Sequence, residues 1–506
     1  MSLFRRRAPL RALALSAVMG LGLGLGAAGA PVAGAQGQQN GLADQTIQSG
    51  VPGLDPGVSI SQAPPPAVLP TEPNFQYFSS PRDLEGCPQK STPPAAVDHS
   101  EEAQPGQPVP PAPSVQEDPV GGEELGGCAP IAAEGFQTPG DITASGWIVA
   151  DAESRQVLAA QDPHGRYRPA SIIKLLLALV ALDRLDLDKE VTVSEEDIAP
   201  AEGTLIGLGP GGKYSIRDIL SGMLLLSGND AAYELAAQLG GEQKTLELMG
   251  EKCAELGCTD TVPATISGLD KPGNMTSPYD MALIFSAALN NDTYREIAKT
   301  KRIGLPGYPA GPAAAAPDPN DPPAEVAAGT VDAQGNVDNG DGSVTTPDGD
   351  NVRKGFVVYN DNQLLEDYPG AVGGKTGFTD DARQTYVGGA ERDGRTLLVV
   401  LMDGTRVPKA PFDQAAELLD AGFATDPKEK GVGELVGSKE DSANAAGANA
   451  DGSAAAPGEA GKDGSDSGSG VLSSTVGKVP PAGWIGIAAL VVLAILFALT
   501  GRRRRG

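Results

Sequence analysis

The chain reads Arg168-Pro169-Ala170-Ser171-Ile172-Ile173-Lys174 where a leucine-rich helical pattern begins, and that pattern continues to about Leu185. Pro169 is typical of the start of a helix. Because residues three apart lie on one face of a helix, the amine of Lys174 can reach the hydroxyl of Ser171. A lysine accepts a proton only when it is uncharged, so we expect Lys174 to be partly buried or crowded by other cations. The stretch predicts a serine nucleophile with a lysine base.

Two later motifs fit the same chemistry. Ser227-Gly228-Asn229 lies between two helical patterns, where a loop can direct a hydroxyl and an amide into a cleft. Lys375-Thr376-Gly377 lies on a strand pattern, and its small residues would let a substrate backbone pair along the strand edge. We expect its lysine and threonine to bind a free carboxylate. Each motif alone occurs by chance, so the prediction rests on the order and setting of all three.

Histidine is too scarce to suggest a Ser-His-Asp triad. The chain has two histidines, His99 in a Pro-rich region and His164 seven residues before Ser171. Neither has the setting of a catalytic base, so lysine is the more credible base.

Four cysteines lie in the part of the chain that we expect to be exported, where disulfides persist. Four cysteines allow three connectivities. We favour Cys87 with Cys128 and Cys253 with Cys258. Neither pair has metal-ligand spacing, so we expect no zinc site and no cofactor.

The composition limits how much of the chain can form a packed core. Of 506 residues, 67 are Gly and 43 are Pro, and 4% are aromatic, which favours one catalytic domain with low-complexity tails. Acidic residues outnumber basic ones by 65 to 38, which gives a net charge of −27. Such a charge repels nucleic acid, so we expect no nucleic-acid partner.

The two ends carry patterns typical of export and membrane anchoring. Residues 1–35 combine early arginines, an apolar run and small residues, as in a secretory signal peptide. We place cleavage after Ala35, with Ala28-Gly29-Ala30 as a second site and an uncleaved anchor helix as the alternative. Residues 482–501 are apolar and long enough to cross a bilayer, and an arginine tail at 502–506 follows.

These ends predict one topology. The positive-inside rule keeps the arginine tail in the cytoplasm and the chain up to Lys478 outside. Residues 429–478 are rich in Gly, Ala, Ser and acidic residues, so we expect a flexible stalk with an r.m.s. span of about 40 Å. We therefore expect a single-pass protein of the cell membrane with an extracytoplasmic catalytic domain. A tail that is cut off and replaced by a lipid is the alternative, which the arginines disfavour.

The patterns between the ends predict an α+β domain at 140–428, with one antiparallel sheet flanked by a helical cluster. Residues 36–139 are rich in Pro and Gly, so we expect a mostly extended, disordered leader. Residues 304–351 form a low-complexity insertion, which we expect to be a mobile surface loop. The strand patterns lie at 145–150, 156–159, 355–359, 372–378, 384–392 and 395–402, and the helical patterns at 171–185, 216–226, 230–239, 245–256, 277–289 and 411–423.

At the three motifs the chain resembles the D-alanyl-D-alanine carboxypeptidases, which are low-molecular-mass penicillin-binding proteins with a β-lactamase/transpeptidase-like fold. The resemblance runs from about Trp147 to Phe423 and includes further runs outside the motifs. The runs are Arg168-Pro169-Ala170-Ser171, Leu224 to Ala232, Ser267-Gly268-Leu269-Asp270, Tyr279-Asp280-Met281-Ala282, Tyr368-Pro369-Gly370 and Gly374 to Thr379.

The resemblance implies a serine peptidase acting on peptidoglycan stem peptides. Ser171 would attack the carbonyl between two terminal D-alanines while Lys174 takes its proton, and the amides of Ser171 and Phe378 would hold the oxyanion. D-alanine would leave, and water would hydrolyse the acyl-enzyme. β-Lactam antibiotics resemble the same dipeptide and should acylate Ser171.

The resemblance also implies roles for the other two motifs. Ser227 would help to pass a proton to the leaving amine, and Asn229 would orient the substrate peptide. Lys375-Thr376-Gly377 would bind the end that carries the terminal carboxylate. Many relatives have Ala-Gly after this motif, whereas this chain has Asp380-Asp381-Ala382-Arg383, so the floor of the pocket is expected to differ.

Two other functions are kept as alternatives. A serine β-lactamase shares these motifs but typically needs a further carboxylate for fast deacylation, and no Glu-x-x-Leu-Asn follows Asn229. A membrane-anchored stalk also suits an immobile wall polymer better than a diffusing drug. A non-catalytic wall-binding surface protein is the second alternative, and the intact Ser171, Lys174 and Lys375 weigh against it.

Overall fold

The computed structural model describes residues 82–103, 106, 108–310, 334, 336–339 and 343–437. All of them belong to one unit of the chain, Met1–Ala446. The predicted signal peptide, the stalk from residue 438 onward, the membrane segment and the arginine tail lie outside the described residues. Within the described ranges, no helix combines the length and apolar character that crossing a membrane requires.

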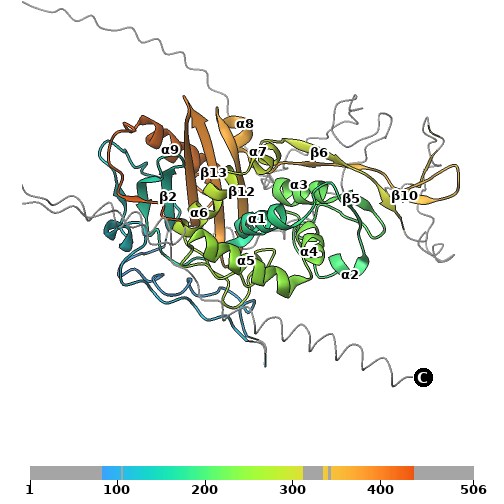
Figure 1. Cartoon of the computed structure of the whole chain (residues 1–506), viewed down its shortest axis with the longest axis horizontal. Helices are drawn as coiled ribbons and strands as arrows, with labels where there is room; N and C mark the ends of the chain where they lie inside the picture. Colours follow the sequence, from blue (N-terminus) through green and yellow to red (C-terminus); the bar gives the residue numbers. More distant parts are fainter. Residues whose placement is uncertain are drawn as a thin grey trace, which may run out of the picture. The chain divides into compact units, whose positions relative to one another are not determined.

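A seven-stranded antiparallel sheet forms the centre of this unit (Figure 1). Its strands run in the order β1-β3-β2-β14-β13-β12, with β15 also paired to β3. β12 ends the order, so within the described residues one of its edges has no partner strand. The strands are β1 Ile131–Ala132, β2 Gly146–Asp151, β3 Gln156–Gln161, β12 Ala371–Thr379, β13 Arg383–Arg392, β14 Arg395–Gly404 and β15 Gly433–Glu434.

Helices cover both faces of the sheet. The alternation of side chains along β14 sends Val399 and Leu401 into the apolar cluster around α9, and Leu398 and Val400 into the cluster around α1. A strand buried on both faces is therefore apolar at successive positions. The helices are α1 Lys174–Arg184, α2 Glu195–Ile198, α3 Ile216–Leu226, α4 Asn229–Gln238, α5 Glu242–Leu256, α6 Pro278–Leu289, α7 Asp292–Ala298, α8 Leu364–Asp367 and α9 Pro411–Ala424.

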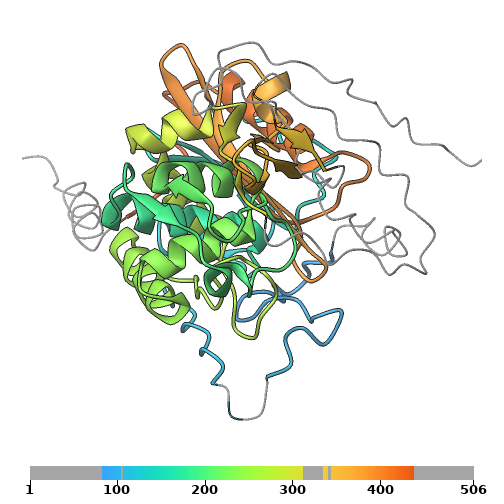
Figure 2. The ribbon, with the colours of Figure 1, turned by 90° about the vertical axis from the view of Figure 1, so that its right-hand side faces the viewer.

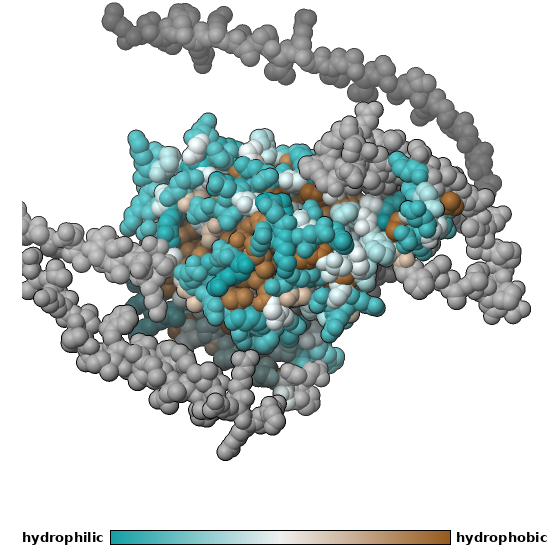
Figure 3. Space-filling model, turned by 45° about the vertical axis from the view of Figure 1, so that its right-hand side comes forward, coloured by the Kyte–Doolittle hydropathy of each residue, from teal (hydrophilic) through white to brown (hydrophobic). Residues whose placement is uncertain are grey.

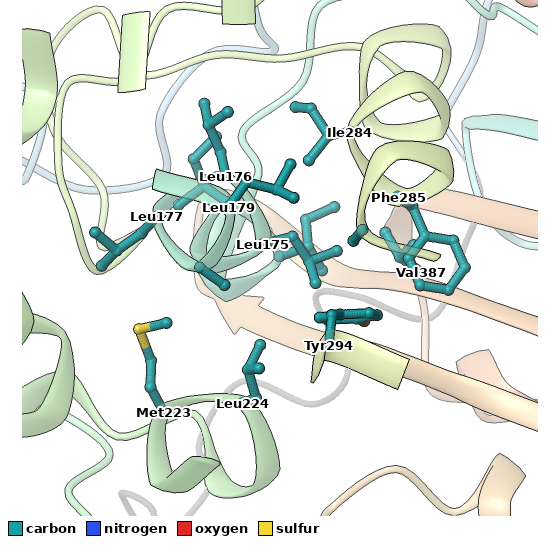
Figure 4. Packing of buried hydrophobic residues seen from close by; sticks show 14 of the residues in the cluster. Leu175, Leu176, Leu177, Leu179, Met223, Leu224, Ile284, Phe285, Tyr294 and Val387 are labelled. Carbon is teal, nitrogen blue, oxygen red and sulfur yellow. The ribbon is translucent and has the colours of Figure 1, made fainter. Parts of the chain in front are cut away.

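The helix α1 lies inside the helical cluster. Leu175, Leu176 and Leu177 are fully buried, and Figure 4 shows side chains of α3, α6 and β13 packed around the helix. A helix that is apolar on every side is typical of a protein core. The turn that precedes α1 is therefore mounted on a rigid element.

Local sequence signals set several of the boundaries. Ser215 and Asp218 form a capping box at the start of α3, and Ser277 caps α6 just before Pro278. The main strands and helices lie within a few residues of the predicted ranges. The helix predicted from 171 is different, because it begins as the 3-10 turn η3 (Ala170–Ile173) and becomes α1 at Lys174.

The described part of the N-terminal region packs against the rest of the unit, so the prediction of a disordered leader is wrong for the described residues from 82 to 139. It contains little regular structure beyond η2 (Glu123–Gly126) and β1. The sulfurs of Cys87 and Cys128 lie at disulfide-bonding distance. The buried Arg166 donates to the carbonyl oxygens of Ser91 and Pro113, at 3.0 and 2.6 Å. Composition did not reveal these contacts because they join segments far apart in the sequence.

The predicted insertion and stalk also differ from the structure. The described residues of 304–351 form most of a small four-stranded antiparallel sheet, whose last strand ends at Arg353, rather than a mobile loop alone, and the rest of the insertion lies outside the described residues. Residues 429–437 pack on β3 through β15, so the stalk cannot begin at 429. The remaining strands are β4 Glu190–Thr192 with β5 Lys213–Ser215, β6 Arg302–Leu305 with β11 Phe356–Tyr359, and β7 Tyr308–Pro309, β8 Val337–Asp338, β9 Ser343–Thr345 and β10 Asn351–Arg353.

The predicted bond between Cys253 and Cys258 is absent, and both residues carry free thiols. They flank the left-handed turn at Gly257 that ends α5, where the Cys258 amide donates to the Cys253 carbonyl oxygen at 2.9 Å. Burial, helped by a hydrogen bond to Cys253, raises the pKa of the Cys258 thiol. The short spacing correctly indicated proximity, but the two cysteines are free thiols rather than a disulfide.

Hydrophilic residues cover most of the described surface in the view of Figure 3, with apolar residues visible between them. Among the described residues, few large apolar side chains are strongly exposed. Three of them are Val97, Leu205 and Phe378. Phe378 follows the Lys-Thr-Gly motif on β12, and exposed apolar side chains near a candidate site can contact a ligand.

Candidate active site

Ser171 lies in the turn η3 that leads into α1. The preceding residue, Ala170, has a left-handed backbone with φ 47°, which is strained for a residue with a Cβ atom. Lys174 lies one turn later, and its Nζ is 2.8 Å from Ser171 Oγ. This is the contact that the spacing of three residues predicts. It is short enough for direct proton transfer between the two atoms.

Lys174 is fully buried. Burial, followed by the positive charge of Lys375, lowers the pKa of Lys174 well below its ordinary value. The carboxylates of Asp361 and Asp230 oppose this effect to a smaller extent. Both conditions that the sequence analysis required, burial and a nearby cation, are therefore present, and the amine can accept a proton.

The loop that begins at Ser267 orients the lysine. The Ser267 carbonyl oxygen accepts a hydrogen bond from Lys174 Nζ at 2.5 Å and lies 3.4 Å from Ser171 Oγ. Gly268 has φ 89°, and a Cβ atom there would lie 2.0 Å from the Ala170 carbonyl oxygen. A neutral amine that donates to Ser267 keeps its lone pair free for Ser171.

Ser227 and Asn229 lie at the junction of α3 and α4. Ser227 ends α3 in the left-handed conformation, with φ 67°, and Asn229 begins α4. The Asn229 amide group donates to the Glu202 carbonyl oxygen. Ser227 Oγ and Asn229 Oδ1 are buried and have no hydrogen-bond partner among the described residues. Buried polar atoms are normally paired, so these two are available to a substrate or to water.

Lys375 and Thr376 lie on β12 beside a carboxylate that the sequence analysis did not single out. The Thr376 hydroxyl donates to Asp361 Oδ2 at 2.7 Å, and Lys375 Nζ lies 4.0 Å from the same oxygen. Lys375 is fully buried, and burial lowers its pKa while Asp361 opposes that shift. The lysine and threonine can thus hold a carboxylate between them, because they already contact one from the protein itself.

Gly377 brings β12 into direct contact with the nucleophile's turn. A Cβ atom on Gly377 would lie 2.9 Å from the Ser171 backbone nitrogen. The Thr385 hydroxyl on β13 donates to the Pro169 carbonyl oxygen at 2.8 Å, which fixes the sheet against this turn. Phe378 follows with a side chain that is 47% exposed.

Three groups that complete the site lie outside the three motifs. Asp361 has no motif around it, and its amide donates to the Leu225 carbonyl oxygen at 2.9 Å, which ties the Lys-Thr-Gly strand to the end of α3. Ser267 was quoted only as part of a matching run, and it acts through its main chain, so its side chain does not indicate the role. Arg168 was quoted only as part of a matching run, yet it is buried three residues before Ser171.

Arg168 lies in a cluster with three acidic residues. Carboxylate oxygens of Glu101, Asp270 and Asp381 all lie within 4.8 Å of one another. Arg168 donates to both carboxylate oxygens of Glu101. Burial raises the pKa of Asp270 to about 6. Each of the three carboxylates already accepts a hydrogen bond from the protein, and Arg168 pairs with Glu101, so the cluster fits an ion-pair network better than a metal site.

The two histidines have other contacts. His99 is exposed and hydrogen-bonded to Glu102 at 2.6 Å. His164 is partly buried, with one ring nitrogen 2.8 Å from Asp260 and the other 3.0 Å from the Val120 carbonyl oxygen. Both nitrogens of His164 are therefore engaged, which agrees with lysine as the base.

Known proteins with similar sequences share one description. The family described as D-alanyl-D-alanine carboxypeptidase matches residues 133–304. The D-alanyl-D-alanine carboxypeptidase DacB2 of Mycobacterium tuberculosis is 40% identical over 292 residues, which cover 57% of this chain and 85% of DacB2. DacF of Bacillus subtilis, with the same description, is 26% identical over 282 residues, which cover 55% of this chain and 61% of DacF.

A solved structure of a D-alanyl-D-alanine carboxypeptidase from M. tuberculosis also aligns with the chain. It is 38% identical, covers 60% of this chain and 99% of its own, and has a TM-score of 0.49.

Proposed function

The chain belongs to the D-alanyl-D-alanine carboxypeptidase family, and from that premise we propose that it removes the terminal D-alanine from peptidoglycan stem peptides through an acyl-enzyme on Ser171. One observation carries the proposal: Ser171 Oγ lies 2.8 Å from the Nζ atom of a buried lysine whose pKa is lowered. A neutral amine there can take the hydroxyl proton as the oxygen attacks, so no histidine is needed.

Acylation begins when Ser171 Oγ attacks the carbonyl carbon between the two D-alanines. Lys174 takes the hydroxyl proton, and the amides of Ser171 and Phe378 stabilise the developing oxyanion. The proton passes to the leaving amine with the help of Ser227, whose hydroxyl is buried and has no partner among the described residues. The peptide C–N bond breaks, D-alanine leaves, and the rest of the peptide stays esterified to Ser171.

Deacylation uses the same base. Lys174 takes a proton from water as the water attacks the ester, and Ser171 recovers its proton when the ester bond breaks.

The free carboxylate of the donor is bound by Lys375 and Thr376, which favours removal of a terminal residue over cleavage within a chain. β-Lactam antibiotics should acylate Ser171 by the same attack.

Release of D-alanine tests the proposal. The full chain, purified in detergent, is incubated with a pentapeptide ending in D-Ala-D-Ala, and a fluorescent penicillin is used to label it. We expect wild type to release D-alanine and to be labelled, and Ser171→Ala to do neither. Ser286→Ala on α6 is the matched control and should do both. A Ser171→Ala protein that still takes up the label would show that another residue is the nucleophile.

The same labelling separates the two alternatives. A non-catalytic wall-binding protein would not be labelled at all. A β-lactamase would lose the label quickly by hydrolysis and would release no D-alanine. The buried base next to Ser171, whose pKa is lowered, supports the peptidase over the first alternative.

We also propose that the enzyme is held at the outer side of the cell membrane by residues 482–501. The apolar segment, the arginines at 502–505 and the signal-like residues 1–35 support this topology. A bond between Cys87 and Cys128 would be stable in that compartment. Protease added to intact protoplasts should remove the catalytic domain and leave a short membrane fragment. A catalytic domain that stays protected would contradict the proposed orientation.

A further inference from the structure

The N-terminal segment Pro94–Glu102, here called the strap, reaches the end of β12 just beyond the Lys-Thr-Gly motif. In Figures 1 and 2 the blue N-terminal region lies at the end of β12 where the chain turns into β13. The Val97 amide and the Ser100 hydroxyl donate to the two carboxylate oxygens of the buried Asp381, at 2.5 and 3.0 Å. The strap is thus fixed to the turn between β12 and β13.

The strap also contacts the turn that carries the nucleophile. Arg168 donates to the Pro94 carbonyl oxygen at 2.7 Å and to the carboxylate of Glu101. Arg168 is 3% exposed and lies three residues before Ser171. A buried arginine needs such partners, so this side chain depends on the strap.

The strap also lies close to the Ser267–Asp270 loop. A carboxylate oxygen of Glu101 lies within 4.8 Å of one from Asp270, and Asp270 accepts a hydrogen bond from the Thr379 hydroxyl at 2.7 Å. The strap therefore meets both β12 and the loop whose carbonyl orients Lys174. It lies where the end of β12 and this loop approach each other, at the hydrogen bond between Thr379 and Asp270.

The proposed function sets the direction of the substrate along β12. The terminal carboxylate lies at Lys375 and Thr376, and the scissile carbonyl lies at the amides of Ser171 and Phe378. The donor therefore runs antiparallel to β12, and its upstream residues continue toward Thr379. At about 3.3 Å per extended residue, the second residue upstream of the scissile bond lies roughly 7 Å farther along.

We propose that the strap forms the outer wall for the donor peptide upstream of the D-alanyl pair, and that it selects donors that extend beyond this pair. This inference rests on the proposed function. Two apolar side chains offer the contact surface, because Val97 on the strap is 49% exposed and Phe378 on β12 is 47% exposed. The Val97 amide donates to Asp381 in the turn after β12, so this residue lies at this end of the site.

The strap lies outside the part of the chain that the family match covers. That match begins at residue 133, whereas the strap ends at Glu102. Selection of the upstream donor by the strap is therefore a property that the family match does not supply. It comes from this chain's own N-terminal segment and from Asp381, which stands where many relatives have a different sequence.

A substitution of Val97 tests the strap without removing a buried group. Val97→Asp places a charge on the exposed wall, and Val115→Asp, at an exposed valine of the same N-terminal region, is the matched control. The full-length proteins are assayed with a pentapeptide donor, with acetyl-D-Ala-D-Ala as the minimal donor, and with penicillin. Loss of one partly buried valine contact costs about 1 kcal/mol, which is roughly a fivefold change.

We expect Val97→Asp to lower kcat/KM for the pentapeptide about fivefold, mainly through KM, as one lost valine contact implies. Cleavage of the minimal donor and acylation by penicillin should change less than about twofold, because neither reaches the strap. An equal loss on all three substrates, or no loss on the pentapeptide, would overturn the inference. Wild type that releases no D-alanine from either donor would instead contradict the proposed function.

Discussion

Two buried lysines and one carboxylate control the charge at the centre of the site. Burial is the main reason that the pKa of Lys174 is low, and Lys375 lowers it further. Asp361 acts in the opposite direction and raises the pKa of both lysines. Because the base works only when it is unprotonated, the acid side of the pH–rate profile follows the pKa of Lys174. These neighbouring charges therefore set the lowest pH at which the enzyme works.

Removing the carboxylate of Asp361 should extend activity to lower pH. In Asp361→Asn the pKa of Lys174 falls, so the acid limb of the kcat/KM profile should move to lower pH. Lys375→Met removes the cation, so the pKa of Lys174 rises and the limb should move to higher pH. Lys375→Met should also weaken donor binding roughly 10- to 100-fold, since a hydrogen bond to a charged group is worth about 1.5 to 3 kcal/mol.

Pentapeptide cleavage measured from pH 5 to 10 checks both shifts. Asp380→Asn, at an exposed carboxylate just after β12, is the control and should leave the limb in place. Limbs that move in the same direction in Asp361→Asn and Lys375→Met would contradict the assignment of Lys174 as the titrating base.

Single residues of the site can be predicted from the sequence when they act through their side chains and belong to short motifs. The contact of Ser171 with Lys174 follows from helical spacing alone. The Ser267 carbonyl oxygen and Asp361 are different, because one is a main-chain group and the other is brought in by a distant segment. A single sequence contains no pattern for either.

The loop of Ser267 and Gly268 is the element that joins the base to the nucleophile's turn. Gly268 has a left-handed backbone and lies against the Ala170–Ser171 peptide. Gly268→Ala adds both strain and a clash, because its Cβ atom would lie 2.0 Å from the Ala170 carbonyl oxygen. We expect a loss of about 1 to 3 kcal/mol in the free energy of unfolding. We also expect slower penicillin acylation, because the Ser267 carbonyl must shift away from Lys174.

Substitution of a second glycine is the control that separates the effect of the steric clash from the effect of backbone strain. Gly135 has φ 84°, and a Cβ atom there would meet nothing within 4 Å. Gly135→Ala should therefore cost only the conformational strain of about 1 kcal/mol and leave acylation unchanged. Thermal unfolding and stopped-flow penicillin acylation measure the two effects. Equal acylation rates in both variants would show that the loop does not position the base.

Elements with strong local signals could be predicted from the sequence. The capping box of α3 and the strand patterns of β13 and β14, joined by the turn Asp393-Gly394, give signals that do not depend on distant residues. The strand β6 and the small sheet in the insertion lack such signals, whereas β11 lies within the strand pattern predicted at 355–359. Their strands are two to four residues long, and they form because partners elsewhere in the chain satisfy their backbone groups.

The whole unit depends on an N-terminal region whose composition suggests disorder. Its packing comes from single long-range contacts, such as the ion pair between Arg82 and Asp403 and the hydrogen bond between His164 and the Val120 carbonyl oxygen. Propensity scales describe only neighbours in the sequence, so they cannot reveal a segment that is ordered by another part of the chain. The family resemblance did not help either, since its match begins after most of this region.

Buried acidic groups beneath this region predict how stability depends on pH. Burial, with repulsion from Asp260, raises the pKa of Asp280 to about 7, and burial raises that of Asp162 to about 6. Although burial opposes its charged form, hydrogen bonding to Asp260 raises the pKa of His164. All three groups bind protons more tightly in the folded state than in the unfolded state. Their stabilising contribution is therefore present at low pH and is lost as the pH rises through the folded pKa values.

We therefore expect the unfolding temperature to fall as the pH rises from 5 to 8. Asp280 and Asp162 lose their protons in the folded protein across this range. Ordinary aspartates, with a pKa of about 3.9, do not titrate there. Calorimetry of the full chain at half-unit pH steps measures the slope. Asp280→Asn cannot ionise, so its slope should be shallower than that of wild type even if its overall stability is lower. Asp393→Asn, in the exposed turn between β13 and β14, should keep the wild-type slope. An unfolding temperature that rises over this range would mean that the buried carboxylates are already ionised and paired in the folded protein.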